Sequence, residues 1–508
     1  MQSASDSHRG RLVLYALIVL LSSGALLVLE IVAGRLLAPY IGVSLYTWTS
    51  IIGVMLAGLS LGNWIGGVWA DRGAGERAAA VVLLLAGLWC ALSLALLGQV
   101  AAGIVERGLS LLSSGFLLAG LLFFMPAVLL GVVTPLLTTL ALRLDTRTGH
   151  VVGRMHALAA VGSIAGTFAA GYWLIQTFGT YAVVRGTAVA LFLMALPLLR
   201  RSKPVLMAVT VGVTVAVAML GASASRAPCD RESAYFCIRV VDRSADAPFG
   251  QARGMVLDHL LHSINHAEEP RLLIAPYVHA MDELVHASFG ERYEQGLNYF
   301  FAGGGAYTQP RAIAAQSPAS RITVAELDAT VTEIASEQMY FDSAGMKIVH
   351  DDARRVLAAE PGPYDVIVGD VFHDVAVPFH LVTREFFELA RSRLTDDGLF
   401  VLNVVDAFPE PKLVKAVLKS LDIVFAQTAV YVDALPEQPT RVTYVIAARQ
   451  SQPWPEWFVA SAGIERGWYR IDEAMRGIGT ALADLPALSD DYAPVERLIA
   501  PLLIGAND

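Results

Sequence analysis

The sequence predicts an N-terminal multi-span transmembrane helical bundle, a small β-hairpin region and a Rossmann-like domain with a parallel sheet. Three observations predict this fold class. Seven long apolar stretches precede residue 225, and a water-soluble pattern follows them. Residues 298–305 form an apolar strand that runs into three glycines, as at the start of a nucleotide-binding unit. The chain is 55% hydrophobic and 16% charged, with a mean hydropathy of +0.54, so lipid must solvate part of its surface.

The apolar stretches divide the chain into a transmembrane domain over 1–225, a β-hairpin or lid region over 226–296 and a catalytic domain over 297–508. A helix needs about 20 apolar residues to cross a bilayer. We expect spans at 11–34, 47–70, 78–100, 112–141, 155–177, 182–199 and 204–222. The first span is too long and too rich in leucine for a removed signal peptide. Small residues at helical spacing, Gly62 and Gly66 in one span and Gly162 and Gly166 in another, predict close helix packing.

Basic residues alternate between the loops and predict the orientation of the spans. Arginines and lysines gather before the first span and after the second, fourth and sixth, at positions 9, 11, 72, 77, 143, 147, 154, 200, 201 and 203. This bias places the N-terminus in the cytoplasm of a multi-pass cell-membrane protein. Seven crossings would then leave the soluble half outside, whereas an eighth crossing or a re-entrant segment would reverse the side.

Cys229 and Cys237 flank a short segment just after the last expected span. A disulfide between them would suit an oxidising compartment and the outside location, whereas two unpaired buried thiols are the alternative. The net charge of −9 and the pI near 5.7 argue against a nucleic-acid partner. His259, His262 and His266 have a spacing that fits no common zinc pattern, so we expect no metal.

After residue 225 the pattern changes to β-hairpins and then to alternating strands and helices. We expect strands at 233–241, 254–257, 298–302, 322–325, 347–349, 364–368, 399–404, 423–430 and 442–447. We expect helices after the glycines, from 328, over 353–359 and from 383. This alternation predicts a largely parallel, methyltransferase-type sheet with crossover helices.

Acidic residues follow the strands of this predicted sheet, where ligands of such sheets bind. The glycines at 303–305 let backbone approach a ligand, and a carboxylate after the second strand is suited to two ribose hydroxyls. The strand-end acids are Glu326, Asp328, Asp351, Asp352, Asp370 and Asp374. The ordered series of glycines and acids predicts a ligand site at this edge of the sheet.

Several motifs between residues 233 and 405 carry a family resemblance. They are the run from Leu257 to His262, the pair Tyr277 and His279 before an expected helix, the glycines at 303–305 and the series of strand-end acids. With them the sequence resembles the spermidine synthase family of aminopropyltransferases, specifically its membrane-anchored branch.

The resemblance implies a role for each motif. Asp370, with Tyr277 beside it, would deprotonate the attacking amine, Glu326 would hold the nucleoside ribose, and Asp352 would face adenine. The remaining cofactor-binding residues would be Gly303, Gly304, Gly305, Asp328 and Asp351, and the substrate-binding residues would be His262, His279, Asp258 and Asp374.

The sequence departs from the family pattern in the amine pocket. The glycine loop of the family continues with an aspartate that binds the aminopropyl ammonium, whereas this chain has Ala306, Tyr307 and Thr308. The lid glutamine is His262, and the lid glycine is His259. The residues of the cofactor pocket are therefore retained better than those of the polyamine pocket.

We expect transfer of an aminopropyl group from decarboxylated S-adenosylmethionine to a diamine such as putrescine. An S-adenosylmethionine-dependent methyltransferase on the same fold is one alternative, and a polyamine-binding transport or sensing membrane protein is another. The expected partners are a small-molecule amine and the lipid bilayer. The sequence leaves the formation of a homo-oligomer open.

Overall fold

The structure, a computed structural model, describes residues 2–105, 107, 109–199, 228–371 and 377–504. The chain divides into two compact units, Met1–Pro228 and Cys229–Asp508. The expected seventh span at 204–222 and the site candidate Asp374 lie outside the described residues.

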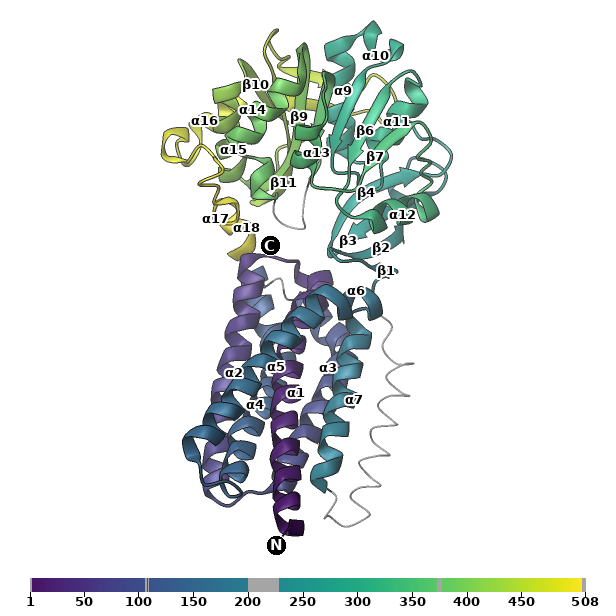
Figure 1. Cartoon of the computed structure of the whole chain (residues 1–508). Coiled ribbons are helices and arrows are strands. Elements are labelled where there is room, and N and C mark those ends of the chain that lie inside the picture. Colours follow the sequence, from purple (N-terminus) through teal and green to yellow (C-terminus); the bar gives the residue numbers. More distant parts are fainter. Residues whose placement is uncertain (1, 106, 108, 200–227, 372–376, 505–508) are drawn as a thin grey trace. The chain divides into compact units, whose positions relative to one another are not determined.

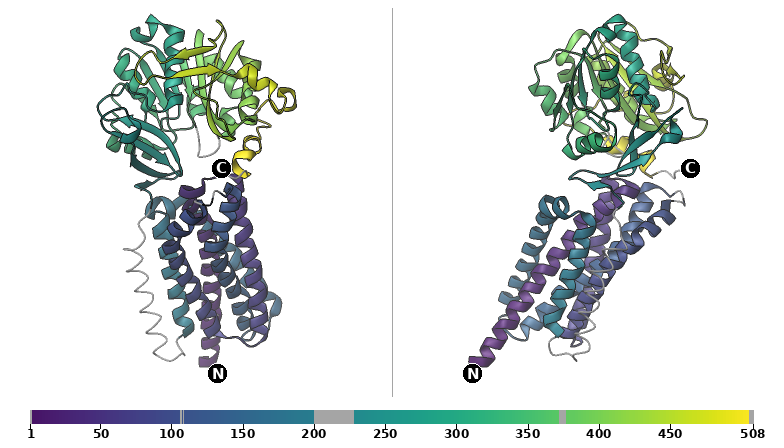
Figure 2. Two further views of the ribbon diagram at one scale, coloured as in Figure 1. Left: turned by 180° about the vertical axis from the view of Figure 1, so that it is seen from behind. Right: turned by 90° about the vertical axis from the view of Figure 1, so that its right-hand side faces the viewer.

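The first unit is helical (Figure 1). Its elements are α1 (Gln2–Ile41), α2 (Leu45–Asp71), α3 (Glu76–Val105), α4 (Leu111–Leu142), α5 (Thr148–Ala169), the π-helical segment Ala170–Leu174, α6 (Ile175–Phe178) and α7 (Thr180–Leu199). Among the described residues, six helices are long and apolar enough to cross a membrane. They cover the first six expected spans, and α5 continues through the π-helical segment into α6. Figure 2 shows α1 running the length of this unit.

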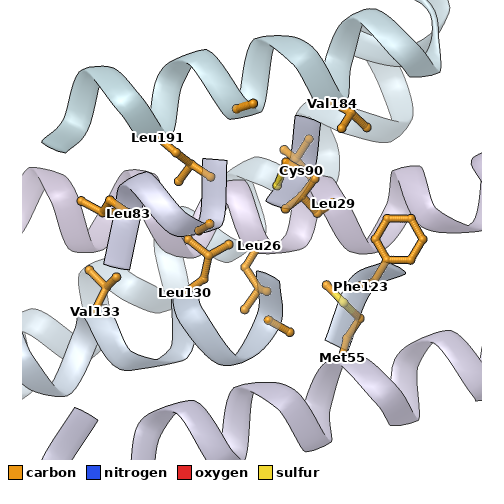
Figure 3. Packing of buried hydrophobic residues seen from close by; sticks show 14 of the residues in the cluster. Leu26, Leu29, Met55, Leu83, Cys90, Phe123, Leu130, Val133, Val184 and Leu191 are labelled. Atoms are coloured by element: carbon orange, nitrogen blue, oxygen red, sulfur yellow. The ribbon is translucent and has the colours of Figure 1, made fainter. Parts of the chain in front are cut away.

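Apolar side chains fill the space between these helices. Leu26 and Leu29 of α1, Leu83 of α3, Leu130 of α4 and Leu191 of α7 meet in one buried cluster (Figure 3). The outer faces of the helices are also apolar, as Leu56 and Trp64 on α2 are more than half exposed. Apolar residues on both the inner and the outer faces are typical of helices that lipid surrounds.

Glycines let two pairs of these helices approach closely, as the sequence predicts. A Cβ atom on Gly62 of α2 would lie 2.1 Å from the Val128 carbonyl oxygen of α4. A Cβ atom on Gly162 of α5 would lie 1.9 Å from the Leu20 carbonyl oxygen of α1. Any side chain at either position would therefore force the helices apart.

The second unit begins with a four-stranded antiparallel sheet in the order β1-β2-β3-β4. Its strands are β1 (Arg231–Glu232), β2 (Cys237–Asp242), β3 (Ala252–Leu257) and β4 (Leu260–His266). The expected single strand over 233–241 is wrong at its start, because the chain turns between Ser233 and Phe236, whose backbone groups are hydrogen-bonded. A disulfide joins Cys229 to Cys237 and confirms the predicted pairing.

A nine-stranded sheet forms the centre of the second unit (Figure 1), in the order β12-β13-β10-β11-β9-β8-β5-β6-β7. Its strands in chain order are β5 (Asn298–Ala302), β6 (Arg321–Ala325), β7 (Met346–Val349), β8 (Tyr364–Gly369), β9 (Leu394–Phe408), β10 (Gln427–Val432), β11 (Thr440–Arg449), β12 (Trp457–Val459) and β13 (Gly467–Arg470). The five strands from β9 to β7 are parallel, and β11 lies antiparallel between β9 and β10. This arrangement confirms the predicted Rossmann-like, methyltransferase-type fold.

The parallel strands are connected by α11 (Thr308–Gln316), α12 (Ala329–Gln338), α13 (Ala353–Ala359) and α14 (Arg384–Arg393). The other helices of the second unit are α9 (Pro276–Phe289), α10 (Glu291–Gln295), α15 (Lys412–Val424), α16 (Asp472–Gly477), α17 (Val495–Leu498) and α18 (Ala500–Ile504), with 3-10 turns at Ser244–Asp246, Phe379–Leu381 and Leu482–Asp484. Tyr277 and His279 lie within the first turn of α9, not before it as expected, because Pro276 begins the helix.

Candidate active site

The order of the large sheet places a binding edge beside β5. The chain leaves β5 for β6 on one side and later returns to β8 on the other, so the crossovers diverge at this point. Ligands of open parallel sheets bind beyond the carboxyl ends of the strands at such a divergence. The glycines after β5, Glu326 after β6, Asp351 after β7 and Asp370 after β8 all lie at this edge.

The glycine loop lies directly against the end of β8. Gly303 has a φ of +89°, and a Cβ atom there would lie 2.1 Å from the Asp370 carbonyl oxygen. Both the conformation and the contact therefore require glycine at this position. The loop and the acid after β8 are thereby held side by side.

Glu326 holds the glycine loop from the neighbouring strand. Its carboxylate accepts hydrogen bonds from the N–H groups of Gly304 at 2.8 Å, Gly305 at 3.4 Å and Asp328 at 2.9 Å. Glu326 is buried, and burial raises the pKa of its carboxyl despite these donors. A carboxylate has room for about four hydrogen bonds, so this one retains capacity for a ligand hydroxyl.

The acids after β6 and β7 also begin helices. One carboxylate oxygen of Asp328 caps α12, and the other is buried with no hydrogen-bond partner among the described residues. Asp352 caps α13 and receives a hydrogen bond from His380 at 2.7 Å. Burial would raise the pKa of Asp352, but the hydrogen bonds from His380 and the Arg355 N–H group lower it. Asp351 pairs with Arg355 at 3.0 Å.

Asp370 follows β8 and is hydrogen-bonded to the side chains of Asn403 and Tyr277. Burial raises the pKa of its carboxyl to about 6, although hydrogen bonds from Asn403 and Tyr277 oppose this shift. The same surroundings raise the pKa of Tyr277 well above its usual range, through burial and the adjacent Asp370 charge. The Tyr277 hydroxyl also reaches the His262 carbonyl oxygen at 2.9 Å. Asp370 is therefore a carboxylate at neutral pH and a base of moderate strength.

The small sheet contributes contacts to the same region. His262 on β4 meets Tyr277 through its backbone carbonyl, and Ser263 accepts a hydrogen bond from the Ala306 N–H group at 3.1 Å. Asp258 forms the turn between β3 and β4 with a φ of +54°, and its carboxylate accepts the Cys237 N–H group at 2.9 Å. This contact gives Asp258 a role in folding the hairpin, and a substrate-binding role stays a prediction.

His279 points into the protein. Its ring lies edge-on to Trp468, with 5.2 Å between ring centres, and its Nε2 lies 3.4 Å from Glu283. The residue is 4% exposed. His279 therefore contacts β13 and its own helix, and its contact with substrate stays a prediction.

Two hollows adjoin Asp370 and Tyr277. A narrow one is lined by the glycine loop and Asp370, together with Ser263 and the buried Gln309. A wider one of about 330 Å³ lies between the start of α9 and the ends of β10 and β11, with Tyr277, Tyr431 and Trp468 in its wall. Tyr277 lines the second hollow while it contacts Asp370, so it stands at the junction of the two.

The structure thus brings together Asp370, Tyr277, Glu326 and the glycine loop. Asn403, which lies within β9 and donates to Asp370, is a site residue that was not predicted from the sequence. An amide inside the apolar run 399–405 is the signal that would have revealed it. Ser263 and Gln309 were also missed, and they lack any comparable signal.

Residues 285–455 match the family of the spermine/spermidine synthase domain. The second unit therefore contains a spermine/spermidine synthase domain. The matched range of this synthase domain includes the glycine loop and the acids after β6, β7 and β8. Asp258, His262, Tyr277 and His279 precede it.

Curated relatives resemble the synthase domain in part. A probable polyamine aminopropyl transferase from Bifidobacterium longum is 36% identical over 103 residues, which are 20% of this chain and 23% of that protein. A polyamine aminopropyltransferase from Vibrio vulnificus is 34% identical over 105 residues, which are 20% of this chain and 34% of that protein. The chain thus spans between 23% and 34% of the length of these two relatives.

A solved structure of a probable spermidine synthase from Corynebacterium glutamicum also resembles the chain. The two share 24% sequence identity with a TM-score of 0.42, and the match covers 52% of this chain and 97% of that chain.

Proposed function

We propose that the second unit is an aminopropyltransferase that moves the aminopropyl group of decarboxylated S-adenosylmethionine to a diamine such as putrescine. We further propose that the helices of the first unit hold it in the cell membrane. The observation that carries the proposal is the position of Asp370 and Tyr277 beside the glycine loop of a spermine/spermidine synthase domain.

The donor carries a sulfonium, which is already a good leaving group, so the protein has to position the amine and remove its proton. Asp370 would accept that proton, and its pKa of about 6 keeps it ionised at neutral pH. Tyr277 and Asn403 would fix the orientation of the Asp370 carboxylate. Glu326 would bind a ribose hydroxyl, and the Asp328 oxygen that has no hydrogen-bond partner among the described residues would add negative charge nearby.

One observation favours the methyltransferase alternative. Ala306 stands where the family offers a carboxylate to the donor ammonium, and Ala306 is fully buried. Asp370, Glu326 and Asp328 still give this edge of the sheet a negative charge, which favours a cation. We therefore keep the aminopropyl donor as the first choice and the methyl donor as the second.

The test is incubation of the purified full-length protein with putrescine and either decarboxylated S-adenosylmethionine or S-adenosylmethionine, with products identified by mass. We expect an aminopropylated product with the first donor only. A methylated product with the second donor would establish the methyltransferase. Binding of either donor without any product would instead favour the transport or sensing role.

The affinities of the two donors give a second measure, because the extra carboxylate of S-adenosylmethionine should be repelled by the acidic edge. The lost contact at Ala306 corresponds to about 1.5–3 kcal/mol, the usual value of a hydrogen bond to a charged group. A clear preference for S-adenosylmethionine in equilibrium binding would overturn the aminopropyltransferase proposal.

A further inference from the structure

A cavity of about 450 Å³ opens in the helical unit. Its lining residues come from the end of the bundle where α1 begins, which is marked N in Figure 1. Its wall is formed by the first turns of α1, the loop into α3 and the final turns of α4 and α7. The lining residues are Arg11, Tyr15, Gly75, Glu76, Arg77, Leu140, Arg143, Leu144 and Leu198. None of them belongs to the candidate active site, which lies in the other unit.

Positive charge dominates the wall of this cavity. Three arginines and one glutamate line it, which leaves a formal excess of two positive charges. Glu76 receives a hydrogen bond from the Tyr15 hydroxyl and lies 3.7 Å from Arg11. Asp145, just beyond α4, is held by Arg147 at 2.8 Å and so does not neutralise the lining arginines. The cavity therefore favours an anion.

The donors in the wall suit a phosphate group. Arg143 donates one hydrogen bond to the Ala70 carbonyl oxygen at 3.3 Å, and a guanidinium has five N–H donors in a planar fork that matches phosphate oxygens. The 30-residue helix α3 begins at Glu76, so its first turn adds partial positive charge to the same wall. Guanidinium groups and a helix N-terminus thus act on the same open cavity.

The apolar part of the wall decides between a soluble anion and a lipid. Leu140 and Leu198 come from helices that are long and apolar enough to span a membrane, and Leu144 follows directly after α4. A free phosphate gains nothing from these side chains, whereas the glycerol and the first acyl carbons of a lipid would cover them. Basic hollows between spanning helices are suited to anionic headgroups.

We propose that this cavity, formed by the ends of α1, α3, α4 and α7, binds the phosphate headgroup of an anionic phospholipid. Arg11, Arg77 and Arg143 would contact the phosphate, and the three leucines would contact the lipid beyond it. The proposal requires that the spans lie in a bilayer. It does not depend on the reaction catalysed by the second unit.

The test measures the melting temperature of the full-length protein in neutral detergent during titration with short-chain phosphatidic acid, phosphatidylcholine or inorganic phosphate. We expect saturable stabilisation by phosphatidic acid and none by the other two. Arg143→Gln and Arg77→Gln should each weaken the apparent affinity for phosphatidic acid by about tenfold, because a charge-assisted hydrogen bond is lost.

Arg154→Gln is the matched control, since it removes an exposed arginine of α5 that does not line the cavity. Arg143→Lys keeps the charge and should retain part of the affinity, so it separates binding from a folding defect. The proposal would be overturned if phosphatidylcholine or inorganic phosphate stabilised the protein as much as phosphatidic acid does. It would also be overturned if Arg143→Gln, Arg77→Gln and Arg154→Gln all reduced the affinity for phosphatidic acid equally.

Discussion

The acidity of Asp370 follows from its surroundings. The carboxyl lies at the end of a buried strand, so burial favours its neutral form, while Asn403 and Tyr277 stabilise its charged form. The balance leaves a pKa of about 6, which is high for an aspartate and low enough for ionisation at pH 7. Such a group accepts a proton more readily than an ordinary carboxylate does and is still available at neutral pH.

Replacing Asp370 with asparagine should slow aminopropyl transfer by roughly 100-fold or more, with little effect on donor binding. The reason is that the amide keeps the shape of the side chain but accepts no proton. Steady-state kinetics with binding of methylthioadenosine measures both effects. Asp396→Asn, which changes a fully exposed acid, is the control. Turnover within a few-fold of the unsubstituted protein would remove Asp370 from the mechanism.

The same pKa predicts the pH dependence of transfer. Below about pH 6 the Asp370 carboxyl is protonated and cannot serve as the base, so kcat/KM should fall as the pH decreases through this value. The acidic limb should be absent from the residual activity of Asp370→Asn. An identical limb in both proteins would assign it to another group.

Glu326 bonds the glycine loop, and we propose that it also binds the nucleoside. Glu326→Ala should weaken binding of methylthioadenosine by about 1–3 kcal/mol, because a buried carboxylate that accepts a hydrogen bond from a ribose hydroxyl is lost. Calorimetric titration measures this change. Glu337→Ala on the exposed face of α12 provides the comparison. An unchanged affinity in Glu326→Ala would mean that the nucleoside binds elsewhere.

At the scale of elements, the sequence predicts those strands and helices whose positions depend on a local pattern of residues. The strands β5, β6, β7 and β8 are short, mostly apolar runs that are followed within two residues by glycine or acid, so both their positions and the acids after them follow from the pattern. The boundary near Ile423 could not be predicted in this way. The expected strand over 423–430 is wrong at its start, because α15 continues to Val424 and β10 begins at Gln427. An apolar pair at the end of an amphipathic helix fits either structure.

The contacts around Asp370 are a second feature that could not be predicted from the sequence. Asn403 comes from β9, and Tyr277 comes from α9, which is almost 100 residues earlier than Asp370. Only the order of strands in the sheet and the packing of α9 bring them together, and no local pattern records such long-range contacts. The extension of the sheet by β12 and β13 was also missed, since these strands are short and join the large sheet only through the pairing of β13 with the distant strand β10.

The close packing of α1 against α5 predicts how a substitution in α5 changes the stability of the helical unit. Gly162→Ala should destabilise the helical unit by about 1–3 kcal/mol, because the added methyl group would lie 1.9 Å from the Leu20 carbonyl oxygen. Gly153→Ala on the same helix meets nothing within 4 Å and should be neutral or slightly stabilising. Thermal unfolding in detergent compares the two. Equal melting temperatures would show that the α1–α5 contact tolerates a side chain.

At the scale of the whole molecule, the disulfide bears on two questions: how the second unit folds and on which side of the membrane this unit lies. Cys229 and Cys237 are joined at the start of this unit, and the Cys237 N–H group is bound by Asp258 at the turn of the next hairpin. The disulfide therefore holds the start of the small sheet. Strand β4 of this sheet places the His262 carbonyl oxygen against the Tyr277 hydroxyl. Disulfides persist in oxidising compartments, and the arginine bias of the loops also favours an outside location for this unit.

The last prediction is that the second unit lies outside the cell. A membrane-impermeant maleimide should label Cys229 and Cys237 in intact cells only after treatment with an impermeant reductant. Cys90, the other cysteine of the chain, is buried in α3, and Cys90→Ser removes any background from it. The double variant Cys229→Ser and Cys237→Ser should give no label. Labelling that appears only after lysis would place the unit in the cytoplasm, and the arginine bias would then have to be reconciled with an even number of crossings.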